Sequence, residues 1–308
     1  MSKKPSHFNQ GFSLIEMAIV LLIIGLALGM TLNVTRGMRD TQNRQLVQSK
    51  LTTLDTALAN FVAQNKRLPC PANGTIASGA VNAGIETLSP GPPPAALPPK
   101  GSCNPISQIN GVIPWVTLGL TESDASDPWN GRMSYRVDPA LAGSAPLPLL
   151  MNMSNCDPSR IAVGVASTSC AAPILPCTES SGCTSPNDFL LNKGLDVWNG
   201  VGGAGGWATR QNNPANGTGA AYVIISHGPS GTGAYNGNGI LQPGSIAAGT
   251  NETPNRNNRA IAIPSALGTS YRDAQLNDIT TAAHFDDYLS HPTIMSVLNK
   301  ANLGPRAH

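Results

Sequence analysis

The sequence predicts an α+β protein in which a long N-terminal helix precedes a head built on an antiparallel β-sheet. Three observations favour this class. An uncharged apolar run begins near residue 12, an amphipathic pattern with helical spacing continues from it to about residue 65, and residues 66–308 alternate short strand-like runs with turn residues. The head is therefore expected to hold short strands separated by long loops.

The apolar run from Phe12 to Met30 contains one ionisable side chain, that of Glu16. At about 1.5 Å rise per residue, a helix over residues 12–34 is long enough to cross the roughly 30 Å hydrocarbon layer of a bilayer. A carboxylate at that depth is costly and usually has a partner and a function. Lys3 and Lys4 precede the run, so the positive-inside tendency predicts a cytoplasmic N-terminus and places the residues after the run outside the cytosol.

Helical spacing continues beyond the apolar run. Apolar residues recur there at alternating spacings of four and three, with polar residues such as Asp55 between them: Val47, Leu51, Leu54, Leu58 and Phe61. The first prolines after this stripe stand in Leu68-Pro69-Cys70-Pro71, where they remove backbone donors and disfavour helix before them. We therefore expect one helix over residues 12–65, membrane-spanning over 12–34 and amphipathic over 35–65.

Strand-like runs in the head are short. The best are Ile161–Ala166, Ala220–Ser226 and Ala260–Ile263, with Met133–Val137 and Val112–Leu118 as weaker candidates. Asn-Gly pairs at residues 110–111, 130–131 and 236–237 mark tight turns between strands. The chain contains 32 glycines and 26 prolines, which is above the average content and favours long loops.

The six cysteines all follow the predicted membrane segment, on the side where disulfides form: Cys70, Cys103, Cys156, Cys170, Cys177 and Cys183. Six cysteines allow fifteen complete pairings, and sequence alone selects none of them. We expect local bridges, Cys70–Cys103, Cys156–Cys170 and Cys177–Cys183. A zinc cluster is the less favoured alternative, because no CxxC pair occurs and the histidines do not flank the cysteines at ligand spacing. We assign no metal ligand.

The sequence lacks the motifs of the common enzyme and nucleic-acid-binding classes. The glycine-rich stretch Gly228–Gly239 has no Gly-Lys-Ser/Thr for a phosphate, and no Gly-x-Ser-x-Gly accompanies His227, His284 or His291. The formal net charge is +2, and no basic cluster occurs outside the first four residues. We predict no catalytic residues and no nucleic-acid partner, and we interpret the histidines as satisfied polar or surface residues.

Two processing schemes compete at the N-terminus. An ordinary signal peptidase would cut after the apolar core, with residues 27–29 as a rough small-x-small site, and would release a soluble protein. In the other scheme the cut falls before the core, between Gly11 and Phe12, and the helix is kept. The two schemes predict proteins of different kinds, because only the second leaves Glu16 in the mature chain.

The N-terminal residues resemble those of a known family. A short basic leader ending in Gly11, then Phe12, Ser13, Leu14, Ile15 and Glu16 ahead of an unbroken apolar helix, is similar to the type IV pilins and the pseudopilins of type II secretion. The resemblance implies that residues 1–11 are a leader removed by a prepilin peptidase and that Phe12 is N-methylated. Its cationic amino group would pair with Glu16 of the same or a neighbouring subunit, because opposite charges attract strongly at low dielectric. The resemblance favours the second processing scheme.

Short segments of the head extend the resemblance. Residues 127–131, Asp-Pro-Trp-Asn-Gly, followed by Tyr135, are similar to the Asp-Pro-Trp-Gly turn before a strand in major pseudopilins, with the last two residues in reverse order. Residues 222–228 resemble a strand and turn of pilin-like heads, and residues 285–288 resemble their last strand. Some relatives bind calcium in a late loop; we expect no cofactor here, keep calcium as the alternative, and map no calcium ligands onto this chain. We interpret Asp286 and Asp287 as surface or strand-end residues.

The resemblance implies a pilin-like fold, in which the second half of the helix lies against the sheet of the head. It also implies a single-pass inner-membrane protein with a periplasmic head, residues 66–308, that enters a type IV pilus or a type II secretion pseudopilus. The implied partners are the prepilin peptidase, other pilin or pseudopilin subunits and the inner-membrane assembly platform. The large head favours a minor subunit, because long loops would crowd the lateral contacts of a filament. A pilus-tip adhesin and a secreted soluble protein remain as alternatives.

Overall fold

The computed structural model describes residues 13–90, 101–138, 141–142, 151, 190–200, 209–257, 270–278 and 282–303, without the side chains of residues 27–37 and 105–106. The chain divides into two compact units, residues 1–46 and 47–308, and the boundary falls within the first helix. Among the described residues, the first unit consists almost wholly of helix, and every strand belongs to the second unit.

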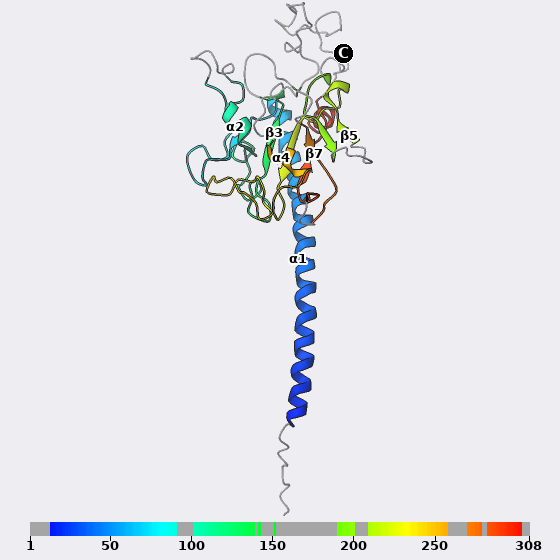
Figure 1. Cartoon of the computed structure of the whole chain (residues 1–308). Coiled ribbons are helices and arrows are strands. Elements are labelled where there is room, and N and C mark those ends of the chain that lie inside the picture. The colour runs from blue at the N-terminus through cyan, green and yellow to red at the C-terminus, as the bar shows by residue number, and fades with distance from the viewer. Residues whose placement is uncertain are drawn as a thin grey trace, which may run out of the picture. The chain divides into compact units, whose positions relative to one another are not determined.

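The described elements confirm an α+β protein (Figure 1). In chain order they are α1 (Leu14–Asn65), β1 (Ala72–Asn73), α2 (Pro105–Ile109), β2 (Gly111–Val112), β3 (Ser134–Val137), β4 (Val197–Asn199), β5 (Thr209–Asn212), the 3-10 helix η4 (Pro214–Asn216), β6 (Tyr222–Ser226), α4 (Glu252–Asn257), β7 (Tyr271–Arg272), β8 (Tyr288–Ser290) and α5 (Ile294–Lys300).

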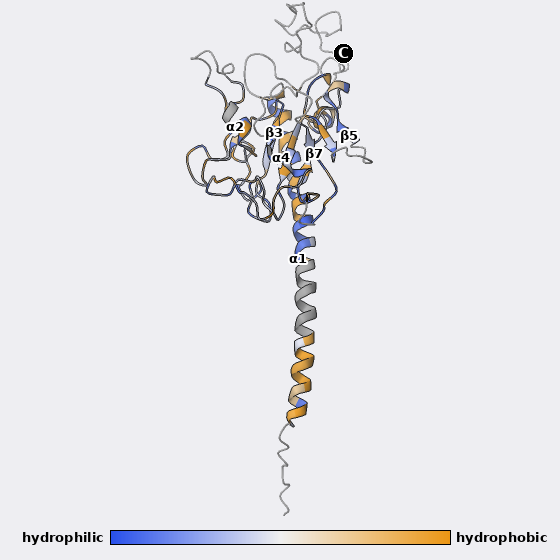
Figure 2. Cartoon of the chain, viewed as in Figure 1, coloured by the Kyte–Doolittle hydropathy of each residue, from blue (hydrophilic) through white to orange (hydrophobic). Residues whose placement is uncertain are grey.

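The first turns of α1 are strongly apolar, and its sequence becomes polar from about residue 35. Figure 2 shows its first turns as mainly hydrophobic, and several of its large side chains are more than half exposed in the single chain: Leu14, Ile15, Ile19, Leu21, Leu22, Ile23 and Leu26. Phe12 and the side chains of residues 27–34, which belong to the expected membrane segment, lie outside the described set. Among the helices that the structure describes, none combines the length and apolar content needed to cross a membrane.

The part of α1 within the second unit carries the predicted apolar stripe into the core of the head. Val47, Leu51, Leu54 and Leu58 are at most 3% exposed. The stripe ends at the fully buried Val62 instead of Phe61, which is half-buried under the guanidinium of Arg67. A spacing of four from Leu58 keeps Val62 on the same face of the helix, whereas a spacing of three turns Phe61 toward its edge.

The main sheet of the head has five strands in the order β1-β2-β3-β6-β8, and every neighbouring pair is antiparallel. Every residue of β6 is buried. Tyr222 and Ile224 belong to the core that contains the α1 stripe, whereas Val223 and Ile225 belong to a second core with Val197. Because successive side chains of a strand point to opposite faces, β6 is covered on both sides, which accounts for its continuous apolar run.

A second, three-stranded sheet has the order β5-β4-β7, and its β4–β7 pair is parallel. The sequence did not predict this sheet. Its strands read Val-Trp-Asn, Thr-Arg-Gln-Asn and Tyr-Arg, which are too short and too polar to stand out from loops.

Two of the predicted strands are confirmed, since Met133–Val137 contains β3 and Ala220–Ser226 contains β6. The predicted strand Val112–Leu118 is wrong beyond β2. Pro114 has no N–H for a ladder, and the chain enters turns in which Leu118 donates to the Pro114 carbonyl. Ile161–Ala166 and Ala260–Ile263 lie outside the described residues.

The disulfide between Cys70 and Cys103 confirms the first of the three expected bridges, with the two Cα atoms 5.3 Å apart. It ties the chain just after α1 to the segment that leads into α2. Both cysteines are buried in the main core. The other four cysteines, Cys156, Cys170, Cys177 and Cys183, lie outside the described residues.

Arg132 holds several loops of the head together from inside. It is 1% exposed, and its guanidinium donates to Glu122, to the carbonyls of Gly74, Ile76 and Gly237, and to the Ser78 hydroxyl. Its hydrogen bonds satisfy loop carbonyls that no strand pairs with, which is how a glycine-rich head with short strands keeps its loops in place.

Candidate functional site

Glu16 lies in the first turn of α1, where it takes part in a reciprocal cap. The Ser13 backbone N–H donates to Glu16 Oε2 at 3.0 Å, and the Ile15 N–H donates to Ser13 Oγ at 3.3 Å. Ser13 therefore acts as the N-cap and Glu16 as its partner three residues later, an arrangement that satisfies free donors at a helix start. The carboxylate also lies at the positive end of the helix dipole, where negative charge is favoured.

Because this hydrogen bond is exposed, the Glu16 carboxylate is accessible from outside the chain. A cationic group of another molecule can therefore contact this carboxylate without disturbing any buried group. Gly11 and Phe12, the predicted cleavage and methylation residues, lie outside the described residues. The structure thus places the predicted assembly residue at the start of the helix, and the predicted pairing of its charge with Phe12 is untested.

The turn at residues 127–131 is fixed by the side chain of Asp127. Its carboxylate accepts the backbone N–H of Trp129 at 3.0 Å and of Gly131 at 2.8 Å, and also the hydroxyl of Ser226 at 2.9 Å. Asn130 adopts a left-handed φ of 66°, which asparagine tolerates better than most residues. Burial raises the pKa of Asp127, and its three hydrogen bonds oppose that rise. The carboxylate therefore joins this turn to β6.

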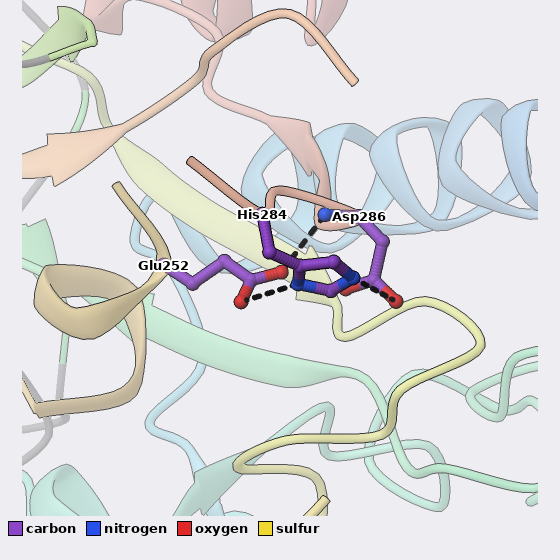
Figure 3. A group of neighbouring side chains, drawn as sticks. All are labelled: Glu252, His284 and Asp286. Atoms are coloured by element: carbon purple, nitrogen blue, oxygen red, sulfur yellow. Dashed lines mark hydrogen bonds and ion pairs between the residues drawn. The ribbon is translucent and has the colours of Figure 1, made fainter. Parts of the chain in front are cut away.

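A buried cluster in the head consists of Glu252, His284 and Asp286, which are each 2% exposed (Figure 3). The imidazole of His284 lies between the two carboxylates. Its Nδ1 is 3.0 Å from Glu252 Oε2, and its Nε2 is 4.0 Å from Asp286 Oδ2. One oxygen from each carboxylate and one ring nitrogen lie within 4.8 Å of one another, a grouping that could hold a metal ion.

Backbone donors hold both carboxylates of this cluster. Glu252 accepts the N–H groups of Gly249 and Asp286, at 2.9 and 2.8 Å. Asp286 accepts the N–H of Ser230 at 2.7 Å and its hydroxyl at 3.0 Å. The cluster therefore joins the segment at the start of α4, the turn after β6 and the segment before β8.

The two carboxyl groups of the cluster titrate differently. Burial, followed by the neighbouring Glu252, raises the pKa of Asp286 to about 7. Burial also acts to raise the pKa of Glu252, but hydrogen bonds from Asp286, Gly249 and His284 outweigh it and lower that pKa. At neutral pH, Glu252 thus carries the negative charge and Asp286 is close to its midpoint.

A second buried row of polar side chains runs through Ser134, His227 and Asp287. Ser134 Oγ is 2.9 Å from His227 Nε2, and His227 Nδ1 is 3.3 Å from Asp287 Oδ1 without hydrogen-bond alignment. The order of groups is that of a nucleophilic triad. Ser134, however, pairs with Ile225 inside the main sheet and is 3% exposed, so a substrate cannot reach its hydroxyl. This row supports the core and gives no basis for catalysis.

A cavity of about 440 Å³ lies beside the first cluster. Its lining includes Trp129, Asn130, Ser230 and Gln242. The N–H and the hydroxyl of Ser230 both donate to Asp286, so Ser230 lies between the cavity and the cluster. Gly228 allows the turn after β6 to lie close to Asp286, because its φ is 56° and a side chain there would collide with the Asp286 carbonyl.

The structure decides between the alternatives left open for the head. Asp286 and Asp287 are buried, so they are not surface residues, but they stand directly before β8 at the strand end. His284 is a buried polar residue bonded to Glu252, as one alternative expected, whereas Nδ1 of the buried His227 has no hydrogen-bond partner in the structure. Glu252 was not singled out in the sequence at all. Its partners are 32 and 34 residues away, so no short spacing pattern could have indicated the cluster. The only signal was the acidic pair before β8, next to a histidine two residues upstream.

Comparisons with known proteins identify the N-terminal segment. Residues 7–32 match the family model described as the prokaryotic N-terminal methylation motif. The chain matches no curated protein and no solved structure. The match includes Gly11, Phe12 and Glu16, the residues on which the predicted processing and assembly depend. The chain thus carries the prokaryotic N-terminal methylation motif, which supports the resemblance of this segment to type IV pilins and pseudopilins.

Proposed function

We propose that the protein is a structural subunit, a minor pilin or pseudopilin, that enters a type IV pilus or a type II secretion pseudopilus through its N-terminal helix. The observation that carries the proposal is the methylation motif over residues 7–32. The exposed apolar side chains of the first turns of α1 support it, because such a surface needs lipid or other subunits to cover it.

In this proposal a prepilin peptidase removes residues 1–11 and Phe12 becomes the N-methylated first residue. The apolar part of α1 anchors the subunit in the inner membrane, with the head in the periplasm, until the assembly platform draws it into a filament. Glu16 then exchanges its exposed bond to Ser13 for the amino group of a neighbouring subunit. That exchange is favourable in an apolar environment, where an unpaired carboxylate is costly.

The first experiment determines the N-terminus of the mature protein, by mass spectrometry of the subunit isolated from membranes with and without the prepilin peptidase. We expect a methylated Phe12 with the peptidase, and an intact leader without it or in a Gly11→Val variant. Gln10→Ala, next to the cleavage site, is the matched control and should still be processed. An N-terminus at or after residue 27 would instead indicate an ordinary signal peptide.

A second experiment separates a structural subunit from a tip adhesin. The chromosomal copy is deleted, and filament number and surface adhesion are measured together. Loss or strong reduction of filaments supports the structural role. Filaments of normal number that fail to adhere would contradict it.

A further inference from the structure

The bonding of His284 is typical of a metal-binding histidine. Its Nδ1 is held by the Glu252 carboxylate at 3.0 Å. Glu252 is itself fixed by the N–H groups of Gly249 and Asp286. In protein metal sites, the ligating histidine commonly donates its other ring N–H to a carboxylate, which sets the tautomer and the orientation of the ring. This arrangement directs the lone pair of Nε2 toward Asp286.

The separation between His284 Nε2 and Asp286 Oδ2 is suited to an ion between them. At 4.0 Å it is too long for a direct hydrogen bond. Zinc bonds imidazole nitrogen and carboxylate oxygen at about 2.0–2.2 Å, so two ligands of one ion lie roughly 3.3 Å apart at a tetrahedral angle and about 4 Å apart when they face each other across it. The two side chains therefore need to move by less than about 1 Å to share an ion.

The charge of the cluster also favours a cation. Two carboxylates, each 2% exposed, lie on either side of one imidazole. An ionised carboxylate away from water is unfavourable unless it is paired. A divalent cation between His284 and Asp286 would supply positive charge next to both carboxylates.

A cavity adjoins the site through Ser230. Ser230 lines the cavity of about 440 Å³, and its N–H and hydroxyl both donate to Asp286. Neither His284 nor Asp286 lines the cavity, so the path of an ion from the cavity to its ligands would pass Ser230. A metal site needs such an entry path in addition to its ligands.

We propose that the head binds one divalent transition-metal ion, of the zinc class, between the Nε2 of His284 and the carboxylate of Asp286, with Glu252 holding the imidazole in place. The mixed nitrogen and oxygen set suits such an ion. Both ligands belong to the segment before β8, and hydrogen bonds already tie that segment to Ser230 in the turn after β6 and to Glu252 at the start of α4. The ion therefore stabilises the point at which these three segments meet.

The test uses the full-length protein in detergent, with its disulfides oxidised, after removal of metal with a chelator. We expect about one zinc ion per chain in equilibrium dialysis. At a hundredfold excess over Kd, zinc should raise the Tm by about 5–10 °C. Calcium in the same concentration range should have little effect. Absence of stoichiometric zinc binding, or calcium binding tighter than zinc, would overturn the proposal.

Variants locate the ion. His284→Gln should abolish stoichiometric binding, and Asp286→Asn should weaken it at least as much as Glu252→Gln, for which we expect a loss of about 10–100-fold in affinity. The matched control is His291→Gln, because His291 also faces an aspartate, Asp273 at 3.1 Å, but lies outside the cluster. It should bind zinc like the unaltered protein. Equal binding by the unaltered protein and His284→Gln would contradict the assignment.

X-ray absorption at the zinc edge of the unaltered protein keeps the proposal testable if these variants do not fold. We expect imidazole nitrogen and oxygen ligands at about 2.0–2.2 Å. Sulfur in the coordination shell would place the ion on cysteines and overturn the proposal, as would a shell that contains no imidazole.

Discussion

Two carboxylates on α1, those of Glu16 and Asp55, are held by different hydrogen bonds. Glu16 is held by the reciprocal cap with Ser13 at an exposed helix start. Asp55, on the buried part of α1, accepts the hydroxyl groups of Tyr222 and Ser290 at 2.8 to 2.9 Å. The first carboxylate is therefore available to a partner outside the chain, whereas the second is committed to the head.

We expect Glu16→Ala to leave the head folded but to reduce incorporation into filaments strongly. The variant removes both the carboxylate that we propose to pair with an incoming amino group and one half of the cap, which is worth about 1 kcal/mol. Glu16→Gln separates the two effects, because an amide can still accept the Ser13 N–H but carries no charge. Immunoblotting of sheared filaments measures incorporation. Normal incorporation of both variants would contradict the role of the charge.

The pH dependence of the free energy of unfolding should show the contribution of Asp55. Burial raises its pKa above the ordinary value of 3.8, although the hydroxyl groups of Ser290 and Tyr222 oppose the rise. Its contribution to the free energy of unfolding is therefore complete below about pH 3.8 and is lost as the pH rises through the raised pKa of the folded state. Relative to Asp55→Asn, the unaltered protein should lose stability over that range in urea titrations. Asp40→Asn, at an exposed position of α1, is the control, and an equal pH profile for the unaltered protein and Asp55→Asn would refute the expectation.

At the scale of elements, α1 and β6 position the rest of the head. The apolar stripe of α1 covers one face of the main sheet, and the small second sheet covers the other face of β6. Because both faces of β6 are buried, its five residues contribute to two cores at once. The turn after β6 then carries Ser230 to Asp286. The position of the buried cluster thus follows from the register of one strand.

Leu54→Ala should test the contribution of the α1 stripe. Leu54 is fully buried in the main core, so truncation removes apolar contacts and leaves a cavity. We expect the free energy of unfolding of the head to fall by about 2–5 kcal/mol. Thr53→Ala, the neighbouring exposed position, should change it by no more than about 0.5 kcal/mol. Tryptophan fluorescence during denaturant unfolding measures both, and equal effects would show that the stripe does not pack as described.

At the scale of the whole molecule, the head combines short strands with long connections. Its described strands have two to five residues, so ladder hydrogen bonds alone cannot hold the loops. Arg132, the Cys70–Cys103 disulfide and the buried His–carboxylate cluster each link segments that are distant in sequence. Such links limit the freedom of the unfolded chain or satisfy buried polar groups, and thereby compensate for the short strands.

The disulfide should contribute measurably to the stability of the head. Cys70 and Cys103 are separated by 33 residues, and closing a loop of that size stabilises a folded state by about 2–4 kcal/mol. The double variant Cys70→Ala/Cys103→Ala should lose that amount in thermal unfolding under oxidising conditions. Reducing agent should then have a smaller effect on the variant than on the unaltered protein. An unchanged Tm in the double variant would contradict the expectation.

The sequence by itself determined the N-terminal part of the protein, that is, the long first helix and the motif at its start. Helical periodicity, the prolines after residue 68 and the motif around Gly11 to Glu16 are local patterns, and the structure confirms α1 while the family comparison confirms the motif. Local chemistry also indicated β3, β6 and the Asp127 turn. These features depend on residues that are neighbours along the chain, which is the information that a sequence displays directly.

Only the tertiary structure decided which distant segments of the head contact one another. It showed that β6 is buried on both faces, that a second sheet contains a parallel pair, and that Glu252 meets His284 and Asp286 across more than 30 residues. Burial on both faces leaves only a continuous apolar run, which does not show what covers each face, and a contact between distant side chains leaves no pattern at all. They depend on which strands pair and which loops close over them, and that is settled by the packing of the whole head.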